Sequence, residues 1–178
     1  MQSGKQAHTI RAYLWGRFSG LGLVVAALTA AADQGHKWWM ILGYHIEEKG
    51  RVAVLPILDL VYTLNTGISY SLFEMKGRNG QLLLAAFAAL ASVALWVAIA
   101  RLATSRLMAM SLALILGGAV GNGLDRVTLG GVADFFLFHA FGYNWYIFNI
   151  ADVAIAAGVI GLLYDSYVTS RKDATKPL

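Results

Sequence analysis

Four apolar segments, the second of them long and the other three short, set the strongest limit on what this chain can fold into. A transmembrane helix needs about 20 mostly apolar residues, or somewhat fewer where flanking Lys and Arg side chains reach the membrane surface. The segments predict spans at about 17–33, 81–100, 106–122 and 148–167. Of the 178 residues, 58% are hydrophobic and 13% charged, whereas a soluble domain has about 45–50% apolar and 25% charged residues. We therefore predict a mainly α-helical membrane protein, with residues 1–178 forming a single domain.

The positions of Lys and Arg predict how the spans are oriented, because cytoplasmic loops and ends carry an excess of these residues. With four spans, one side receives both chain ends and the short loop between the second and third spans, which together hold Lys5, Arg11, Arg17, Arg101, Arg106, Arg171, Lys172 and Lys176. We expect this side, with both termini, to be cytoplasmic, and the connections 34–80 and 123–147 to lie outside. The formal charge of +4 does not indicate nucleic-acid binding, since the basic residues bracket apolar segments and form no basic face.

A cleaved signal peptide is an alternative interpretation of the first apolar segment. Its basic start, its short apolar core and the small residues at 29–32 resemble a cleavage site. Cleavage would leave three spans and a new N-terminus outside the cell at Asp33. It would also take Asp33 and Lys37 away from their helix, so we favour an intact first span.

The first outer connection is expected to form a small extracytoplasmic β-sheet or hairpin between the first and second spans. Residues 52–55 and 58–64 have an extended pattern, and the second segment alternates in polarity. Asn65-Thr66-Gly67 predicts a turn into a further strand at 68–73. Aromatic residues crowd both outer connections, as in an interfacial belt. Both connections should therefore lie along the membrane surface.

Polar residues gather at the outer ends of the spans and in the outer connections, where they are costly and therefore candidates for function. They are Asp33, Lys37, Asn65, Asn122, Asp125, Arg126, Asp134, Asn149 and Asp152. Asn122-x-x-Asp125 and Asn149-x-x-Asp152 each place an amide and a carboxylate on one helical face. Because Arg126 follows Asp125, we predict an ion pair or a helix-end hydrogen bond there. Asp134 and Asp152 have no neighbouring cation and are the acids most free to titrate.

Two carboxylates in a partly desolvated site cannot both ionise easily, so the pair can supply an acid and a base at neutral pH. That is the chemistry of aspartic proteases. Eighteen residues separate Asp134 from Asp152, and the residue pattern leaves open whether they meet. The chain has no cysteine, its four histidines lack the HExxH spacing, and it has no G-x-S-x-G or P-loop motif. We expect no metal and no organic cofactor.

Closely spaced glycines predict where the third span packs. Gly117 and Gly121 are four residues apart on one helical face, the small-xxx-small pattern of packed membrane helices. Close packing there would bring Asn122 and Asp125 near a neighbouring helix.

Five sequence blocks, taken together and in order, resemble lipoprotein signal peptidase, or signal peptidase II, a family of bacterial inner-membrane aspartyl proteases. The resemblance covers nearly the whole chain. The blocks are Asp33-Gln34-Gly35-His36-Lys37, Asn65-Thr66-Gly67-Ile68-Ser69, the segment 117–126, Val132-Ala133-Asp134-Phe135 and Phe148-Asn149-Ile150-Ala151-Asp152. The resemblance implies that Asp134 and Asp152 are the catalytic pair. It also implies a supporting or substrate-binding set of Asp33, Lys37, Asn65, Gly67, Asn122, Asp125, Arg126, Asn149 and Ala151, with Asn65 touching the substrate backbone.

The same resemblance implies an endopeptidase that removes the signal peptide from diacylglyceryl-modified prolipoproteins, cutting just before the lipidated cysteine. Its partners would be that prolipoprotein and membrane lipid, with no nucleic acid, and a monomer is expected. The enzyme would lie in the inner membrane with its active site at the outer face. The chain departs from the family pattern at His36, at Ile68-Ser69 and at Tyr146. None of these changes removes an acid, although the bulk of Ile68 is expected to narrow the substrate groove.

Two other functions are compatible with these residues. A small proton-coupled transporter would use Asp125, Asp134 and Asp152 as a relay, but the acids cluster at one face and no inverted repeat is visible. An inactive scaffold of the same fold differs from the enzyme only in activity.

Overall fold

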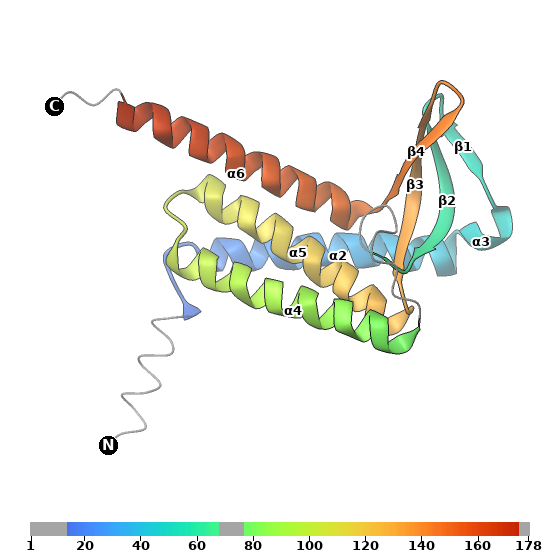
Figure 1. Ribbon diagram of the computed structural model, residues 1–178, viewed down its shortest axis with the longest axis horizontal. Helices are drawn as coiled ribbons and strands as arrows, with labels where there is room; N and C mark the ends of the chain where they lie inside the picture. The colour runs from blue at the N-terminus through green and yellow to red at the C-terminus, as the bar shows by residue number, and fades with distance from the viewer. Residues whose placement is uncertain (1–13, 68–76, 175–178) are drawn as a thin grey trace, which may run out of the picture.

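The computed structural model describes residues 14–67 and 77–174 (Figure 1). The elements follow the order α2 (Ser19–Trp38), the π-helix η1 (Trp39–Gly43), α3 (Ile46–Lys49), β1 (Val52–Leu55), β2 (Leu58–Asn65), α4 (Arg78–Arg101), α5 (Arg106–Thr128), β3 (Val132–Ala140), β4 (Tyr143–Phe148) and α6 (Ile150–Ala174). The four long helices run lengthwise beside one another, and the strands lie at one end of them (Figure 1). The strand predicted at 68–73, which includes Ile68, falls outside the described residues.

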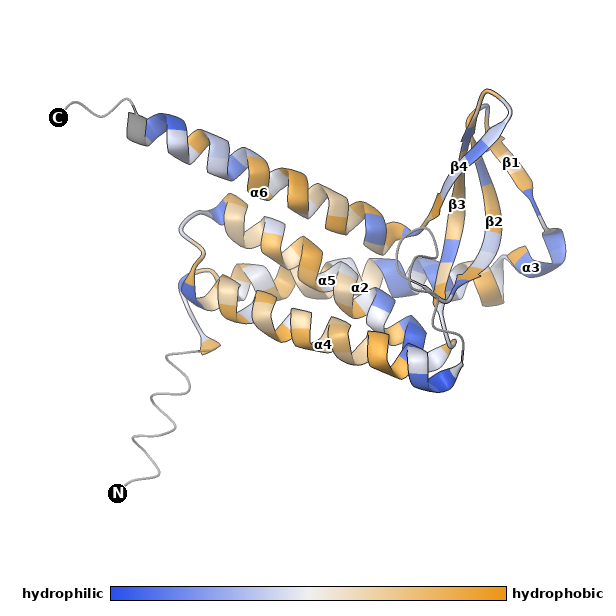
Figure 2. Ribbon diagram, viewed as in Figure 1, coloured by the Kyte–Doolittle hydropathy of each residue, from blue (hydrophilic) through white to orange (hydrophobic). Residues whose placement is uncertain are grey.

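Three helices are long and apolar enough to cross a membrane: Arg78–Arg101, Arg106–Thr128 and Ile150–Lys172. Figure 2 shows apolar residues along their length and polar residues concentrated towards their ends. The helix α4 fully buries only Gln81 and Ile99 against the rest of the chain, and its other residues are half-buried or exposed. Its exposed side chains include the large apolar residues Leu83, Phe87, Leu90 and Val93, as expected of a helix in lipid. The helix α2 is not among the three. It lies alongside them and packs chiefly against α5, and its last turns carry polar residues.

Glycines allow α5 to approach two of its neighbours, α2 and α6. Gly117 and Gly121, the predicted small-xxx-small pair, lie against α2, whereas Gly118 lies on another face against α6. A Cβ atom on Gly117 would lie 2.6 Å from the Ala26 carbonyl oxygen of α2, and a Cβ on Gly118 would lie 2.7 Å from the Ala151 carbonyl oxygen of α6. Both distances are shorter than van der Waals contact. Because α5 packs against α2, α4 and α6, it is the central helix, and the residues at its end meet groups from the other helices.

We expect the Gly118→Ala variant to unfold at a temperature about 2–10 °C lower than the wild type, because the added methyl group must push α6 away from α5. Thermal unfolding in detergent measures this difference. The matched control is Gly20→Ala on α2, where an added Cβ meets nothing within 4 Å, and this change should leave the melting temperature unchanged or raise it slightly. Equal melting temperatures for Gly118→Ala and the wild type would show that the helices are not in close contact there.

The four strands form one antiparallel sheet in the order β1-β2-β3-β4. The strands β1 and β2 lie where the alternation of the first connection predicts them. Two strands of the sheet, β3 and β4, come from the second connection, where the aromatic residues had been assigned only to an interfacial belt. The sheet therefore joins both connections, and a pair of residues on β2 and β3, Thr63 and Asp134, lie directly opposite each other.

The inner face of the sheet has its own small core. Ala133 and Phe135 of β3 are fully buried there with Met40 and Ile46. Neighbouring residues of a strand point to opposite faces, so Asp134, which lies between Ala133 and Phe135, projects from the other face. Packing of this core thus fixes the direction of the Asp134 side chain.

Candidate active site

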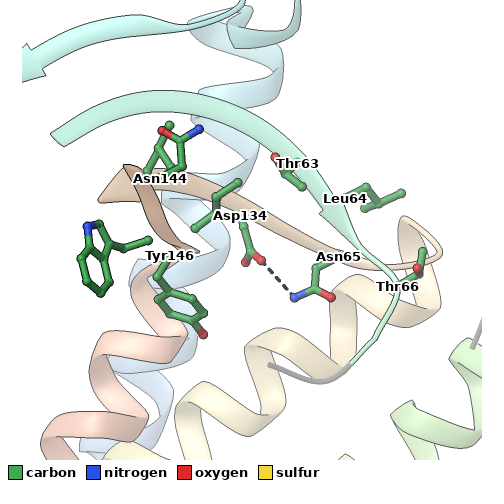
Figure 3. Close-up of a pocket in the computed structure, with 10 residues that line it drawn as sticks. Thr63, Leu64, Asn65, Thr66, Asp134, Asn144 and Tyr146 are labelled. Carbon is green, nitrogen blue, oxygen red and sulfur yellow. Dashed lines mark hydrogen bonds between the residues drawn. The ribbon is translucent and has the colours of Figure 1, made fainter. Parts of the chain in front are cut away.

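Asp134 is held by two amide side chains. The Nδ2 group of Asn149 donates to Oδ1 of Asp134 at 2.7 Å, and the Nδ2 group of Asn65 donates to Oδ2 at 3.3 Å. Figure 3 shows Asp134 and Asn65 pointing toward each other from the neighbouring strands β3 and β2. Asp134 is only 3% exposed, and each of its carboxylate oxygens accepts a hydrogen bond from one amide.

Asp152 is positioned by the start of α6. Asn149 precedes this helix, its Oδ1 accepts the Asp152 backbone N–H at 3.0 Å, and the Asp152 carboxylate accepts the Asn149 backbone N–H at 3.3 Å. This reciprocal pair has the geometry of a capping box. The Asn149-x-x-Asp152 spacing therefore forms a helix cap through backbone N–H groups, and the side-chain amide of Asn149 donates to Asp134 instead of to Asp152. A further amide, Nδ2 of Asn122, donates to Asp152 Oδ1 at 3.1 Å.

The two acids are joined through a bridge of two amide side chains. Nδ2 of Asn149 donates to Oδ1 of Asn122 at 3.1 Å, while Asn149 also holds Asp134 and Asn122 also holds Asp152. Asn122 thus turns to an acid on another helix rather than to Asp125. The structure brings Asp134 and Asp152 into one site despite their separation in the sequence.

One lysine neutralises part of a buried acidic cluster behind this bridge. Lys37 Nζ lies 2.8 Å from Asp33 and 2.7 Å from Asp125, and it donates to Oδ1 of Asn122 at 3.0 Å. Lys37, Asp33 and Asp125 are each no more than 1% exposed. Asp125 does form an ion pair, but its partner is Lys37 and not Arg126, because successive helical residues point in different directions.

The remaining polar residues of the predicted set tie the surrounding elements together. Arg126 donates to the Asn122 carbonyl at 3.1 Å and to the Gly67 carbonyl at 3.0 Å, which links α5 to the end of β2. The Ala151 backbone N–H donates to Asp33 at 2.9 Å, and this bond links α6 to α2. All of the predicted site residues therefore lie in one connected network.

Sequence reasoning missed Gln34 and the backbone of Ala133. The Gln34 side chain donates to Asp125 at 2.7 Å and to the Gly121 carbonyl at 3.1 Å, and the Ala133 N–H donates to Asp125 at 3.0 Å. Asp125 therefore connects α2 to the residue next to Asp134. The position of Gln34 directly after Asp33 was the available signal for its role. The bond from the Ala133 backbone had no signal in the sequence.

Two cavities meet at Asp134. One, of about 250 Å³, faces the helices and holds Asp152 beside Asp134, with an apolar wall formed by Phe87, Ala88, Ala91, Ala119, Val132 and Ile155. The other, of about 350 Å³, lies over the sheet between β2 and β4 (Figure 3). Asn65 and Tyr146 also line both cavities. An extended segment of chain passing Asp134 would have space on either side of it.

Burial raises the pKa of Asp134 to about 7, and the negative charge of Asp152 adds to this effect. The hydrogen bonds from Asn65 and Asn149 and the charge of Lys37 act in the opposite direction but do not cancel it. Near neutral pH, a large share of Asp134 is therefore protonated and able to donate a hydrogen bond. Within residues 14–67 and 77–174, no group of three His, Asp or Glu side chains is arranged to hold a metal ion.

Comparison with known proteins gives a consistent result. Residues 25–168 match the family model described as signal peptidase (SPase) II. A lipoprotein signal peptidase of Rhodopseudomonas palustris (strain TIE-1) is 49% identical over 152 residues, which cover 83% of this chain and 92% of that protein. A lipoprotein signal peptidase of Methylocella silvestris is 48% identical over 157 residues, covering 87% of this chain and 90% of that protein.

Solved structures show the same fold. Two of them, each described as a bacterial membrane enzyme, superpose on this chain with TM-scores of 0.75 and 0.70 at 25% and 26% sequence identity. The first match covers 89% of this chain and 94% of the solved one, and the second covers 86% and 96%.

Proposed function

Because the chain belongs to the signal peptidase II family, we propose that it cuts its substrate with Asp134 and Asp152 as the catalytic pair. It is a membrane aspartic endopeptidase that removes the signal peptide from diacylglyceryl-modified prolipoproteins, cutting just before the lipidated cysteine. One observation carries the proposal for the pair: the two acids line a single cavity and are held by one bridge of two asparagines.

The geometry and the pKa of Asp134 suit a division of labour between the two acids. Asp152 takes a proton from a water molecule as the water oxygen attacks the peptide carbonyl carbon, and protonated Asp134 gives its proton to the carbonyl oxygen. When the C–N bond breaks, Asp152 gives its proton to the leaving amine and Asp134 takes one back from the intermediate. Both acids return to their starting states.

The other residues of the predicted set support this reaction without exchanging protons. Asn65 lines both cavities beside Asp134, so its side chain is placed to hydrogen-bond a substrate backbone that crosses from one cavity to the other. Lys37, which is paired with Asp33 and Asp125, donates a hydrogen bond to Asn122. The start of α6 is fixed by the Asn149 cap and by the hydrogen bond from the Ala151 N–H to Asp33. One chain carries every group named, and we propose that the enzyme acts as a monomer.

We further propose four membrane spans, with α2 as the first, and an active site at the outer face of the inner membrane. The helix α2 lies beside three helices that are apolar enough to span and runs antiparallel to α4 and α6 (Figure 1). The start of α2, the connection between α4 and α5, and the end of α6 lie at the end of the bundle away from the sheet, and they carry Arg17, Arg101, Arg106 and Arg171. The positive-inside rule places that end, with both termini, in the cytoplasm.

Because the chain has no native cysteine, single cysteines test this orientation cleanly. In bacterial spheroplasts, we expect a membrane-impermeant maleimide to label Tyr143→Cys at the end of the sheet and to leave Leu102→Cys unlabelled until the membrane is opened. Both native side chains are well exposed, at 70% and 61%. Labelling of Leu102→Cys in intact spheroplasts would reverse the orientation.

The proposed role of Asp134 also predicts a dependence of stability on pH. Its folded-state pKa of about 7 exceeds the unfolded value of about 3.9, so the wild type loses stability as the pH rises from about 4 to 7. Asp134→Asn stays neutral and avoids this loss. As the pH rises from 5 to 8, the free energy of unfolding of the variant should therefore increase by about 1–3 kcal/mol relative to that of the wild type. Melting curves of both proteins across this range measure the gain, and a constant difference would contradict the raised pKa.

The activity itself is tested by a gel-shift cleavage assay in detergent. We expect the purified protein to cut a prolipoprotein that carries the diacylglyceryl group and to leave the unmodified precursor intact. A folded protein that cuts neither would favour the inactive-scaffold alternative. Proton-driven transport in vesicles by such a protein would instead support the transporter.

A further inference from the structure

A groove that the catalytic reaction does not use lies at the end of the helix bundle away from the sheet. It has a volume of about 460 Å³ and lies between the beginnings of α2 and α5. Its lining combines the guanidinium groups of Arg17 and Arg106 with the apolar side chains of Phe18, Leu21 and Met110. Arg17 and Phe18 directly precede α2, Leu21 lies in α2, and Arg106 and Met110 lie in α5. Figure 1 shows these two helix starts at the end of the bundle opposite the strands, and α2 and α5 pack against each other.

The two arginines have no acidic partner among residues 14–67 and 77–174. The Arg17 guanidinium lies over the ring of Phe18, with the guanidinium carbon 5.2 Å from the ring centre. Both side chains are exposed, and neither α2 nor α5 has an acidic residue in its first turn. Within the part of the chain that the structure describes, the groove therefore presents two guanidinium groups without an ion-pair partner, while Asp165 of α6 accepts a hydrogen bond from Ser105 at 2.6 Å.

The depth of the groove matches the headgroup region of a bilayer. Trp15 and Trp96 pack against each other at this end of the bundle, with ring centres 6.0 Å apart, and the indole N–H of Trp96 donates to the Leu14 carbonyl at 3.1 Å. Trp15 is 52% exposed. Tryptophan is enriched at the membrane–water interface, so the nearby arginines lie at the level of lipid phosphates while Leu21 and Met110 lie one turn deeper.

We propose that this groove binds one anionic phospholipid, with Arg17 and Arg106 on its phosphate and Phe18, Leu21 and Met110 along the first part of an acyl chain. Guanidinium groups form strong, directional hydrogen bonds with phosphate oxygens, and basic pockets between spanning helices bind anionic headgroups. With the orientation proposed above, the lipid belongs to the inner leaflet. A bound lipid would also bridge α2 and α5, the two helices that hold Lys37 and Asp125.

Native mass spectrometry of the detergent-purified full chain tests the site, with phosphatidylglycerol and phosphatidylcholine as probes. We expect the wild type to retain one phosphatidylglycerol at lipid concentrations where phosphatidylcholine is lost. The double variant Arg17→Gln/Arg106→Gln should bind phosphatidylglycerol about 10- to 30-fold more weakly. The matched control is Arg171→Gln/Lys172→Gln, which removes two positive charges from the same end of the bundle but not from the groove, and it should bind like the wild type.

Three outcomes would overturn the proposal. The first is equal weakening in the groove variant and the control, which would mean that the net charge of this end attracts lipid without a defined site. The second is unchanged binding in the groove variant. The third is displacement of the lipid by millimolar inorganic phosphate, which would identify a phosphate site without an acyl-chain subsite. Melting temperature and prolipoprotein cleavage, measured on the same samples, should match the wild type and show that the variants are folded. The measurement of lipid binding by native mass spectrometry depends neither on the catalytic proposal nor on the proposed orientation.

Discussion

Asp134→Asn and Asp152→Asn should each abolish cleavage of a diacylglyceryl-modified prolipoprotein, with rates at least about 1,000-fold below the wild type. Asparagine keeps the size of each side chain and much of its hydrogen bonding but cannot exchange a proton with water or with the leaving amine. Removing one member of a group that acts as a unit costs about as much as removing all of it. The double variant should therefore be no slower than either single variant.

The control is Glu48→Gln, which neutralises an exposed acid on α3 at the same end of the molecule and should cleave at the wild-type rate. Melting temperatures at pH 5 decide whether an inactive variant is folded, since Asp134 is mostly protonated there and asparagine resembles it closely. Full turnover by either folded variant would contradict the catalytic pair. Asp125→Asn should lower activity only partially, because it weakens the link between α2 and the Ala133 backbone without touching the reacting atoms.

The sequence was sufficient to predict the long helices and two of the strands. Four apolar segments bracketed by Lys and Arg leave few alternatives to membrane-spanning helices, and the alternation at 58–64 indicates a strand because its period is two. The helices nevertheless extend beyond the expected spans: α2 continues to Trp38 and α5 to Thr128. Polar residues at these ends bond to one another, and the hydropathy of a segment carries no information about such bonds.

The strands β3 and β4 were missed because their turn lacks the usual residues. They are joined by Phe141 and Gly142, both with positive φ (53° and 80°), and Ala140 pairs with Tyr143. Such two-residue turns favour Asn-Gly or Asp-Gly, and a phenylalanine in the first position hides the signal. The pairing of β3 with β2 also joins segments about 70 residues apart, and local patterns do not specify which distant strands pair.

The convergence of the site could be predicted only in outline. The sequence placed every candidate at the same end of the spans, and the family resemblance singled out Asp134 and Asp152. The asparagine bridge and the pairing of Lys37 with two acids depend on how α2, α5 and α6 cross, and that crossing is set by contacts such as those of Gly117 and Gly118.

Lys37→Met should be the most destabilising single substitution in the cluster, costing about 3–5 kcal/mol. Methionine fills a similar volume but leaves Asp33 and Asp125 without their cation in a site where each is at most 1% exposed, and removing one partner of a buried ion pair costs more than removing both. The double variant Lys37→Met/Asp125→Asn should therefore lose less stability than the sum of the two single variants.

Thermal or denaturant unfolding in detergent measures these three proteins against Lys49→Met, which removes an exposed lysine that stacks on the Tyr44 ring and should cost no more than about 1 kcal/mol. If Lys37→Met cost no more than Lys49→Met, Lys37 would not be the counterion that stabilises these two acids in the folded protein. Because Lys37 also holds Asn122, and Asn122 holds Asp152, loss of the lysine should slow cleavage even at temperatures where the variant remains folded.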